Sequence, residues 1–376
     1  MRIGINALFM IPGAVGGSEI YLRHLIRHLQ RIDRDNDYSV FTNRESANTW
    51  GLTSENFREV VCPVRATFRP ARVFYEQMVL PMQARRHGID VLFSAGYTAP
   101  AVLPCRSVVS IYDLSFLRHP EDFPWLSALA LRGLVPMAAR RADRIVTLSR
   151  ASMREIVAEL GVPEEKVRVI YPAAGECESG PNGGILNDVR GRFGLRGGFI
   201  LTVAASHPHK NLCRLVEAYH SLREVGLIEH QLVLVGLKGR DYPRLTSLIR
   251  QLSLEGEAIV TGWIPERHLA SLYAAADLFV LPSLFEGFGI PALEAMSHGI
   301  PTVLSNAPAL LELAGDAAII VDPYNVGEIA TGIRTVLADP KLRKTLIQRG
   351  YKRAESFSWP EGARQTLSVC VEVMNS

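Results

Sequence analysis

The sequence predicts an α/β protein with two domains, each built around a parallel β-sheet. With 376 residues, the chain is longer than one average domain. Short apolar runs alternate with stretches of helical periodicity in both halves, as in strand–helix units around a parallel sheet. Between the halves, residues 172–184 are rich in turn-forming residues and offer little for a core, which favours an interdomain connection.

The first domain is expected to begin with a strand, a glycine loop and a helix. Ile3 and Ile5 alternate with small or polar residues, as in a strand. Gly16 and Gly17 follow in a loop, and apolar side chains then recur at helical spacing behind Ser18, the expected N-cap. Further strands are expected at Tyr38–Thr42, Val91–Ser94, Val108–Ile111 and Ile145–Leu148.

The second domain is expected to repeat this architecture, with apolar runs typical of strands buried on both faces. A last helix is expected from Trp359 to Met374, with Pro360 near its start. The expected strands are Phe199–Val203, Gln231–Val235, Ala258–Thr261, Leu278–Leu281, Pro301–Leu304 and Ala317–Val321. The expected boundaries are a first domain at 1–172, a connection at 173–184, a second domain at 185–355 and a C-terminal helix at 356–376.

The composition suits a folded protein and gives no general case for nucleic-acid binding. Apolar residues make up 48% of the chain, and the net charge is only +3. Residues 1–175 carry 22 Lys and Arg against 17 Asp and Glu, and the remainder carries 19 against 21. A basic first domain suits anionic lipid or a phosphorylated acceptor, and scattered solvated charge is the plain alternative. The arginines concerned include Arg69, Arg72, Arg85, Arg86, Arg132, Arg140, Arg141 and Arg144.

Cysteine usage and hydropathy favour a cytoplasmic location. The five cysteines are widely spaced, odd in number and without metal-ligand spacing, as expected in a reducing compartment. The chain opens on an alternating strand pattern, so we expect no signal peptide. No apolar run approaches the ~20 residues of a transmembrane helix, and peripheral attachment at the inner face of the plasma membrane stays open.

The most informative motif is Phe285–Glu294, which directly follows a strand-like run. Gly287 and Gly289 allow a tight turn, and Pro291 suits the first turn of a helix. The peptide N–H groups of Gly287, Phe288 and Gly289 are therefore expected at a helix N-terminus, where they form an anion site.

Two carboxylates flank this expected turn. Glu286 is placed in the loop, and Glu294 about one turn into the helix that follows. Ile290, where this helix begins, is a further candidate for donor binding. The backbone amides can hold a phosphate, and the two carboxylates can accept hydrogen bonds from sugar hydroxyls. This combination indicates a nucleotide-sugar site. The plain alternative is a loop acid and an exposed helix acid.

These residues resemble the Glu-x7-Glu motif of the retaining glycosyltransferases with the GT-B fold, and most closely family 4 (group 1), including its mannosyltransferases. Other landmarks of the family follow in the family's order over nearly the whole chain. They are Gly16–Glu19, Val109–Phe116, Ile145–Ser149, Glu165–Pro172, Ile200–Val203, His209–Asn211, Thr261–Trp263, Gly315–Ala318 and Val321–Pro323. The resemblance implies two Rossmann-like domains facing across a cleft and a C-terminal helix that returns to the first domain. It also implies metal independence, with the nucleotide sugar as a co-substrate and no further cofactor.

The resemblance also assigns roles to the donor residues. Lys210, with its neighbour His209, is expected at the diphosphate, where negative charge grows as the glycosidic bond breaks. Glu286 is expected to contact hydroxyls of the transferred sugar and Glu294 those of the ribose. A solvated surface lysine is the plain alternative for Lys210.

Two positions depart from the family pattern. Many relatives have an arginine where this chain has Ala205, so the phosphate charge would rely on Lys210, His209 and the turn amides. Many also have a sugar-contacting histidine where this chain has Tyr112, whose hydroxyl can hydrogen-bond but does not titrate near neutrality. Asp113 is a candidate on the acceptor side, with a strand-end cap as its alternative. Tyr112 and Asp113 complete the predicted catalytic set.

The remaining candidates carry weaker signals. Gly16 and Gly17 open the first helix, where backbone N–H groups can approach a diphosphate or the acceptor. By resemblance Gly262 and Trp263 lie near the base, with a buried turn as the alternative. Asn306 follows a strand and is a lesser candidate for the diphosphate.

We expect a retaining hexosyltransferase that moves a sugar, with mannose from GDP-mannose as the first choice, to a saccharide or lipid-linked acceptor of surface polysaccharide. UDP- and dTDP-sugars are close rivals. The alternatives are a sugar-nucleotide epimerase or a phosphorylase of the same fold, and a non-catalytic homologue that binds sugar or serves as a scaffold. Tyr112 and Ala205 support the last reading.

Overall fold

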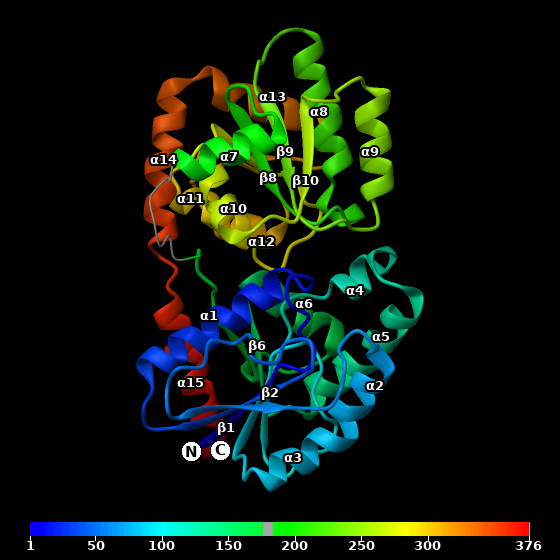
Figure 1. Cartoon of the computed structure of the whole chain (residues 1–376), viewed down its shortest axis with the longest axis vertical. Helices are drawn as coiled ribbons and strands as arrows, with labels where there is room; N and C mark the ends of the chain where they lie inside the picture. Colours follow the sequence, from blue (N-terminus) through cyan, green and yellow to red (C-terminus); the bar gives the residue numbers. More distant parts are fainter. Residues whose placement is uncertain (176–182, 376) are drawn as a thin grey trace. The chain divides into compact units, whose positions relative to one another are not determined.

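The computed structural model describes residues 1–175 and 183–375, and the chain divides into two compact units (Figure 1). The first unit comprises Met1–Pro172 together with Ser358–Ser376, and the second comprises Ala173–Phe357. The expected connection at 173–184 therefore begins inside the second unit. Its residues 176–182 lie outside the described residues.

The first unit contains a seven-stranded parallel sheet with the order β3-β2-β1-β4-β5-β6-β7. Its strands are β1 (Arg2–Asn6), β2 (Asp37–Thr42), β3 (Phe57–Val61), β4 (Val91–Ser94), β5 (Arg106–Ser110), β6 (Arg144–Thr147) and β7 (Val167–Val169). The two edge strands, β3 and β7, were not expected from the sequence. Both are only partly buried, so neither shows the unbroken apolar run by which the inner strands are recognised.

Helices cover both faces of this sheet. Ile3 and Ile5 of β1 face α1 and α15, whereas Leu92 of β4 packs with Leu80 and Ala84 of α3 on the other face. The helical elements are α1 (Gly17–Ile32), α2 (Arg69–Phe74), the π-type turn η1 (Tyr75–Val79), α3 (Leu80–Arg86), α4 (Ser115–Arg118), η2 (Pro120–Asp122), α5 (Trp125–Arg141), α6 (Arg150–Leu160), η3 (Glu164–Lys166) and α15 (Trp359–Asn375).

The start of α1 differs from the prediction. The N-cap position is Gly16, with a φ of 74°, and Ser18 lies inside the first turn. A positive φ suits glycine, which pays no Cβ penalty there, so the chain turns into the helix before it reaches the serine. The loop is closed by the Glu19 carboxylate, which accepts a hydrogen bond from the Gly13 backbone N–H at 2.8 Å.

The last helix, α15, belongs to the first unit and lies beside α1 (Figure 1). The ring of Trp359 stacks on His24 of α1, with ring centroids 4.7 Å apart. At the other end, Glu372 accepts hydrogen bonds from Arg144 of β6 at 2.9 Å and from Arg168 of β7 at 2.6 Å. Aromatic packing and a charged clamp thus fix the two ends of the helix to separate parts of the unit.

The second unit contains a six-stranded parallel sheet with the order β10-β9-β8-β11-β12-β13. Its strands are β8 (Phe199–Val203), β9 (Gln231–Val235), β10 (Ala258–Gly262), β11 (Leu278–Leu281), β12 (Thr302–Ser305) and β13 (Ala318–Val321). All six expected strands are present, with ends that shift by one residue at most. Together, the two parallel sheets confirm the predicted α/β class.

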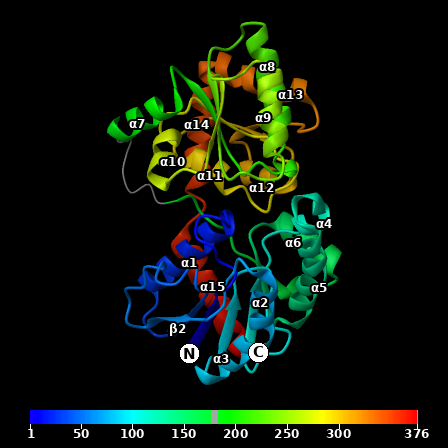
Figure 2. The ribbon, with the colours of Figure 1, turned by 45° about the vertical axis from the view of Figure 1, so that its right-hand side comes forward.

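Figure 2 shows α8, α9 and α13 on one side of the second sheet, and α7, α10 and α14 on the other. The helical elements are α7 (Gly183–Phe193), η4 (Pro208–Lys210), α8 (Leu212–Glu224), α9 (Tyr242–Gln251), α10 (Glu266–Tyr273), α11 (Ile290–Ser297), α12 (Pro308–Ala314), α13 (Val326–Ala338) and α14 (Pro340–Ala354). The core between α8, α13 and the sheet consists of aliphatic side chains such as Leu215, Val216 and Ile333, all fully buried.

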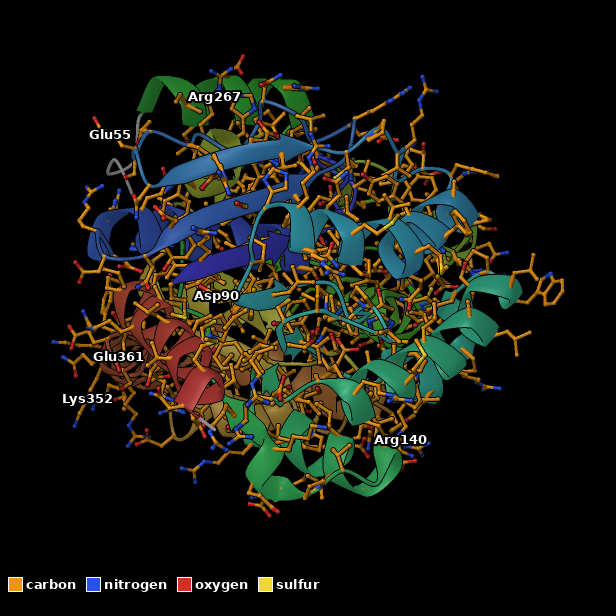
Figure 3. All side chains as sticks on the ribbon, turned by 90° about the horizontal axis from the view of Figure 1, so that it is seen from below. Glu55, Asp90, Arg140, Arg267, Lys352 and Glu361 are labelled. Atoms are coloured by element: carbon orange, nitrogen blue, oxygen red, sulfur yellow. The ribbon has the colours of Figure 1, made fainter. Side chains whose placement is uncertain are left out.

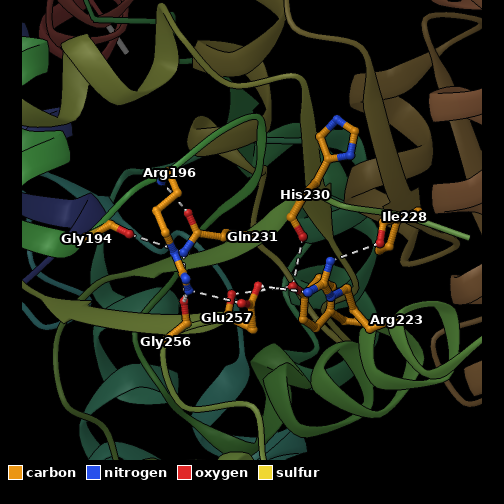
Figure 4. A network of polar contacts seen from close by, with 9 residues as sticks. Gly194, Arg196, Arg223, Ile228, His230, Gln231, Gly256 and Glu257 are labelled. Carbon is orange, nitrogen blue, oxygen red and sulfur yellow. Dashed lines mark hydrogen bonds and ion pairs between the residues drawn. The ribbon is translucent and has the colours of Figure 1, made fainter. Parts of the chain in front are cut away.

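The amino ends of β9 and β10 are held by a polar network (Figure 4). Glu257 accepts hydrogen bonds or ion pairs from Arg196 at 3.0 Å and Arg223 at 3.1 Å. The Gln231 side chain donates to the Gly256 carbonyl at 2.7 Å and accepts from the Arg196 backbone N–H at 2.8 Å. This network lies at the amino ends of the strands, opposite their carboxyl ends. It therefore stabilises the unit away from the candidate site.

None of the described helices is long and apolar enough to cross a bilayer. Four cysteines are described, and all four are free thiols; the fifth, Cys177, lies outside the described residues.

Candidate functional site

The candidate donor residues gather where the order of the second sheet reverses. From β8, the chain adds β9 and β10 on one side, and then returns to place β11, β12 and β13 on the other. β8 and β11 are therefore neighbours in the sheet. In the sequence, two other strands and several helices lie between Val203, the last residue of β8, and Leu278, the first residue of β11. Ligands of open parallel sheets bind outside the carboxyl ends of the strands at such a switch point.

Lys210 and Glu286 meet at this point. Lys210 ends the short helix η4 after β8, and Glu286 lies in the loop after β11. The Lys210 Nζ is 2.8 Å from Glu286 Oε1, and the two side chains are 19% and 12% exposed. Ser283 Oγ donates to the same carboxylate oxygen at 2.8 Å. The predicted diphosphate residue and the predicted sugar residue thus form one preorganised ion pair.

This surrounding keeps the Glu286 carboxylate ionised. Burial by itself raises the pKa of the group, but the Lys210 ammonium, the nearby His209 and the Ser283 hydroxyl outweigh burial and lower the pKa of Glu286 below its usual value. A charged carboxylate accepts strong hydrogen bonds from sugar hydroxyls, and the paired ammonium is available to an anionic ligand.

The turn before α11 has the predicted geometry. Gly289 is the N-cap of α11, with a φ of 105°, and a Cβ there would lie 2.5 Å from Leu310 Cδ2. Pro291 occupies the first turn of the helix, as expected. The Phe288 side chain is buried against Phe357, so only its backbone faces the turn. The turn therefore has room for glycine alone at position 289.

Ile290 begins α11 and its side chain is buried, as is typical of a core residue. Gly287 lies half-buried in the loop between Glu286 and Phe288. The assignment of these backbone groups to a phosphate stays a prediction.

Glu294 lies in α11, one turn from its start, and is bound to a residue that the sequence did not single out. Tyr273 Oη donates to Glu294 Oε2 at 2.9 Å. Burial raises the pKa of Glu294 to about 7, although the Tyr273 hydrogen bond and the Gly175 backbone oppose the rise. Glu294 thus changes charge near neutral pH, unlike Glu286. Its predicted role toward a ribose stays a prediction.

Asn211 is a positioning residue that sequence reasoning missed, although it stands in the motif His209–Asn211. Its side-chain amide donates to the carbonyl of Pro282 at 3.0 Å and to that of Pro323 at 2.7 Å. Its φ is 59°, in the left-handed region that asparagine tolerates better than most residues. One buried amide therefore ties the loops after β8, β11 and β13 together. The available sequence signal was the asparagine directly after Lys210, because asparagine is enriched in the left-handed backbone region.

The other second-unit candidates are placed as follows. His209 stacks on His207 with ring centroids 5.9 Å apart, and its carbonyl accepts from the Leu284 backbone N–H at 2.7 Å. Gly262 ends β10 with a φ of 72°, and Trp263 next to it is 59% exposed. The alternative of a buried turn is therefore wrong for Trp263, whose exposed indole is available for stacking. Asn306 is exposed after β12.

The first-unit candidates are placed separately. Gly16 and Gly17 begin α1, and nothing would meet a Cβ at either position, so their surroundings are open. Asp113 follows β5; its carboxylate accepts from the Ser115 backbone N–H at 2.8 Å and from Tyr97 Oη at 3.1 Å. These bonds give Asp113 the strand-end capping role that was its alternative.

Tyr112 is buried, and its hydroxyl donates to the Ala95 carbonyl at 2.6 Å. Its ring packs edge-on against Tyr21 and Tyr97, each with centroids 5.3 Å away. These contacts give Tyr112 a structural role in the core of the first unit, and a catalytic role stays a prediction.

No group of three or more His, Cys, Asp or Glu side chains in residues 1–175 and 183–375 is arranged to hold a metal ion. The run Asp33–Asp37 contains Asp-x-Asp spacing, but it forms the turn between α1 and β2. There the Asp33 carboxylate accepts hydrogen bonds from Tyr38 Oη, the Asn36 side chain and the Asp35 backbone N–H. Metal independence stays a prediction.

Comparison with known proteins identifies relatives of both units. Residues 191–353 match the group 1 glycosyl transferases, and residues 15–174 match glycosyltransferase family 4. The chain is 32% identical to the MMP alpha-(1->4)-mannosyltransferase of Mycolicibacterium hassiacum, with 94% of each chain covered. It is 31% identical to the O-antigen chain mannosyltransferase B of Escherichia coli, with 70% of this chain and 69% of the relative covered.

Solved structures share the fold over the whole chain. Sucrose-phosphate synthase from Thermosynechococcus elongatus is similar with a TM-score of 0.80 and 19% identity, covering 100% of this chain and 99% of that one. HepE from Anabaena, solved in complex with UDP and glucose, is similar with a TM-score of 0.78 and 20% identity, covering 99% and 100%.

Proposed function

The chain belongs to the group 1, family 4 glycosyltransferases, and on that premise we propose that its second unit binds a nucleotide sugar at Lys210, Glu286 and Glu294. The observation that carries the proposal is the Lys210–Glu286 pair, 2.8 Å long, at the switch point of a parallel sheet. Such a pair offers a cation to a diphosphate and a carboxylate to the sugar beside it.

The proposed chemistry is glycosyl transfer with retention of the anomeric configuration. As the anomeric C–O bond breaks, negative charge grows on the leaving diphosphate, so fixed positive potential at that place lowers the barrier. Ala205 contributes no charge. The positive potential would therefore come from Lys210 and from the backbone N–H groups of Gly287–Gly289. Glu286 would orient the sugar by accepting hydrogen bonds from its hydroxyl groups. In a front-side reaction the leaving phosphate itself takes the acceptor proton, which requires no separate base.

We propose GDP-mannose as the donor and a saccharide or lipid-linked saccharide as the acceptor. Support comes from the similarity to mannosyltransferases of two bacteria, one of which is named for the O-antigen chain. UDP- and dTDP-sugars are the rival donors. The first unit would bind the acceptor through the open backbone at Gly16 and Gly17, on the cytoplasmic side of a membrane, with no metal ion and no further cofactor.

The experiment is a donor panel. Purified protein is incubated with GDP-mannose, UDP-glucose and dTDP-sugars, and nucleotide release is measured with and without lipid-linked acceptors. We expect release from one donor, lowered at least roughly tenfold in Lys210→Ala and Glu286→Ala. Lys344→Ala, which removes an exposed lysine on α14, is the matched control and should leave turnover unchanged.

The same panel separates the alternatives. A sugar nucleotide converted without acceptor would indicate an epimerase. Tight nucleotide binding without turnover of any donor–acceptor pair would indicate a non-catalytic homologue, the reading that Ala205 and Tyr112 support. Near-wild-type turnover of Lys210→Ala at saturating donor would remove Lys210 from the proposed role.

A further inference from the structure

The first unit carries an exposed surface in which apolar side chains and arginines are mixed. It is formed by residues 68–86, which include α2, η1 and α3, and by α5; we call it the basic apolar surface. Seven of the eighteen exposed large apolar side chains in the described chain lie on these two short segments, and each is 58–73% exposed. They are Phe68, Phe74, Met78, Met82, Trp125, Leu126 and Leu129.

The two segments form one continuous surface. The Arg69 guanidinium at the start of α2 donates a hydrogen bond to Ser127 Oγ in the first turn of α5. Figures 1 and 2, seen from two directions, both show α2 beside α5. Phe74, Met78 and Met82 recur every four residues, so they share one exposed face of the helical run. The apolar side chains therefore point outward together.

The charge on this surface has one sign. Residues 68–86 and 125–141 contain seven arginines and a single acid, Glu76, which is buried and lies 3.7 Å from Arg72. The other six arginines are exposed, and none of them forms an ion pair with a carboxylate of the described residues; they are Arg69, Arg85, Arg86, Arg132, Arg140 and Arg141. Figure 3 labels Arg140 near the end of α5, whose side chains extend outward from the ribbon.

On α5 the apolar and basic side chains follow each other along one stripe. Trp125, Leu129, Arg132 and Arg140 are spaced by four, three and eight residues, which keeps them on one face of the helix. An aromatic ring and aliphatic side chains suit the boundary between headgroups and acyl chains, and arginines extend from there to lipid phosphates.

We propose that the basic apolar surface docks the chain on a bilayer that contains anionic lipid. Charge complementarity distinguishes this occupant from a second copy of the chain. A symmetric dimer through this face would set the six exposed arginines of one copy against the six of the other, which repel. An anionic bilayer neutralises the same arginines and buries the apolar side chains between them. The proposal concerns where the chain is held and does not depend on the identity of the donor sugar.

The test is co-sedimentation of the full chain with vesicles. One set contains phosphatidylcholine with a minor fraction of phosphatidylglycerol, and the other contains phosphatidylcholine alone. We expect binding to the anionic set only, and weaker binding as salt is raised, because the attraction is screened. Because each arginine near an anionic surface strengthens binding by roughly fivefold, Arg132→Gln/Arg140→Gln should weaken it about 25-fold.

A second variant tests the apolar part. Trp125→Ser/Leu129→Ser should weaken vesicle binding at least roughly tenfold, since two apolar side chains no longer leave water. Val225→Ser/Leu227→Ser, which changes exposed apolar residues of the second unit, is the matched control and should bind as the wild type does. The exposed positions of all four side chains keep the fold intact, which circular dichroism verifies.

Three outcomes would overturn the proposal. They are a wild type that binds neither vesicle set, Trp125→Ser/Leu129→Ser binding as tightly as the wild type, and a lowered oligomer mass of that variant by light scattering, which would assign the surface to a second copy. Turnover with a short water-soluble acceptor should be unchanged in the variant. Loss of vesicle binding with intact turnover therefore separates this proposal from the proposed function.

Discussion

Glu294 allows a quantitative test of the donor site, because its pKa differs from that of Glu286. Burial places the pKa of Glu294 at about 7, against an ordinary value of 4.5. A ribose whose hydroxyls donate to this group requires the carboxylate. With a pKa of about 7, roughly a tenth of the protein carries it at pH 6 and roughly nine tenths at pH 8. Donor affinity should therefore rise about tenfold over this range.

The assay is titration calorimetry with the donor that the panel identifies, at several pH values between 6 and 8. The diphosphate of a nucleotide sugar carries no terminal phosphate that titrates in this range, so the protein dominates the dependence. Glu294→Gln keeps the shape and a hydrogen-bond acceptor but cannot ionise, and its affinity should be nearly flat with pH. Equal pH dependence in the wild type and Glu294→Gln would refute the assignment.

The same pKa predicts a stability effect with a defined sign. An acid with a higher pKa in the folded than in the unfolded state binds more protons when folded, between the two values. The free energy of unfolding therefore falls as the pH rises from about 4.5 to 7, by about 3 kcal/mol at 1.36 kcal/mol per pKa unit. The free energy of unfolding is measured in urea at several pH values for the wild type and for Glu294→Gln. The wild-type value minus the variant value should decline as the pH rises, and a difference that grows with pH would contradict the prediction.

Three further variants test the scaffold. Asn211→Ala removes the two buried hydrogen bonds that the side-chain amide donates to the carbonyls of Pro282 and Pro323. It should therefore lower the free energy of unfolding, measured in urea, by about 2–4 kcal/mol. A loss smaller than the measurement error would show that Asn211 does not hold these loops together. Gly289→Ala should lower donor affinity at least roughly tenfold in calorimetry, because it forces a φ of 105° on a residue with a Cβ, and unchanged affinity would remove the turn from the site. Glu372→Gln should destabilise the first unit by only about 1 kcal/mol at pH 7, since the pair is a third exposed. The guanidinium groups lower the Glu372 pKa, so the wild-type advantage should disappear as the pH falls below that pKa, and persistence in acid would contradict this cause.

Much of the fold was predictable because buried parallel strands leave an unbroken apolar signature. All six strands of the second sheet were expected, and so was α11 with Pro291 in its first turn. The half-exposed edge strands β3 and β7 lack that signature. The start of α1 was misplaced because the backbone of Gly16, and not a side chain, ends the loop.

The site was predictable only where a motif names its residues. Lys210 and Glu286 are 76 positions apart, and their contact depends on the pairing of β8 with β11, which the spacing of residues does not reveal. Tyr273 and Ser283 support the two glutamates through hydroxyl groups that have no motif of their own. Tyr112 looked like a substituted sugar ligand, whereas its hydroxyl is bonded to a backbone carbonyl in the core.

The most direct test of the donor site is a crystal structure of the chain with bound GDP-mannose. We expect diphosphate oxygens about 3 Å from Lys210 Nζ and from backbone N–H groups of Gly287–Gly289. We also expect sugar hydroxyls to donate hydrogen bonds to Glu286, and ribose hydroxyls to Glu294. A diphosphate bound away from the carboxyl ends of β8 and β11, with the Lys210–Glu286 pair untouched, would contradict the proposed donor site.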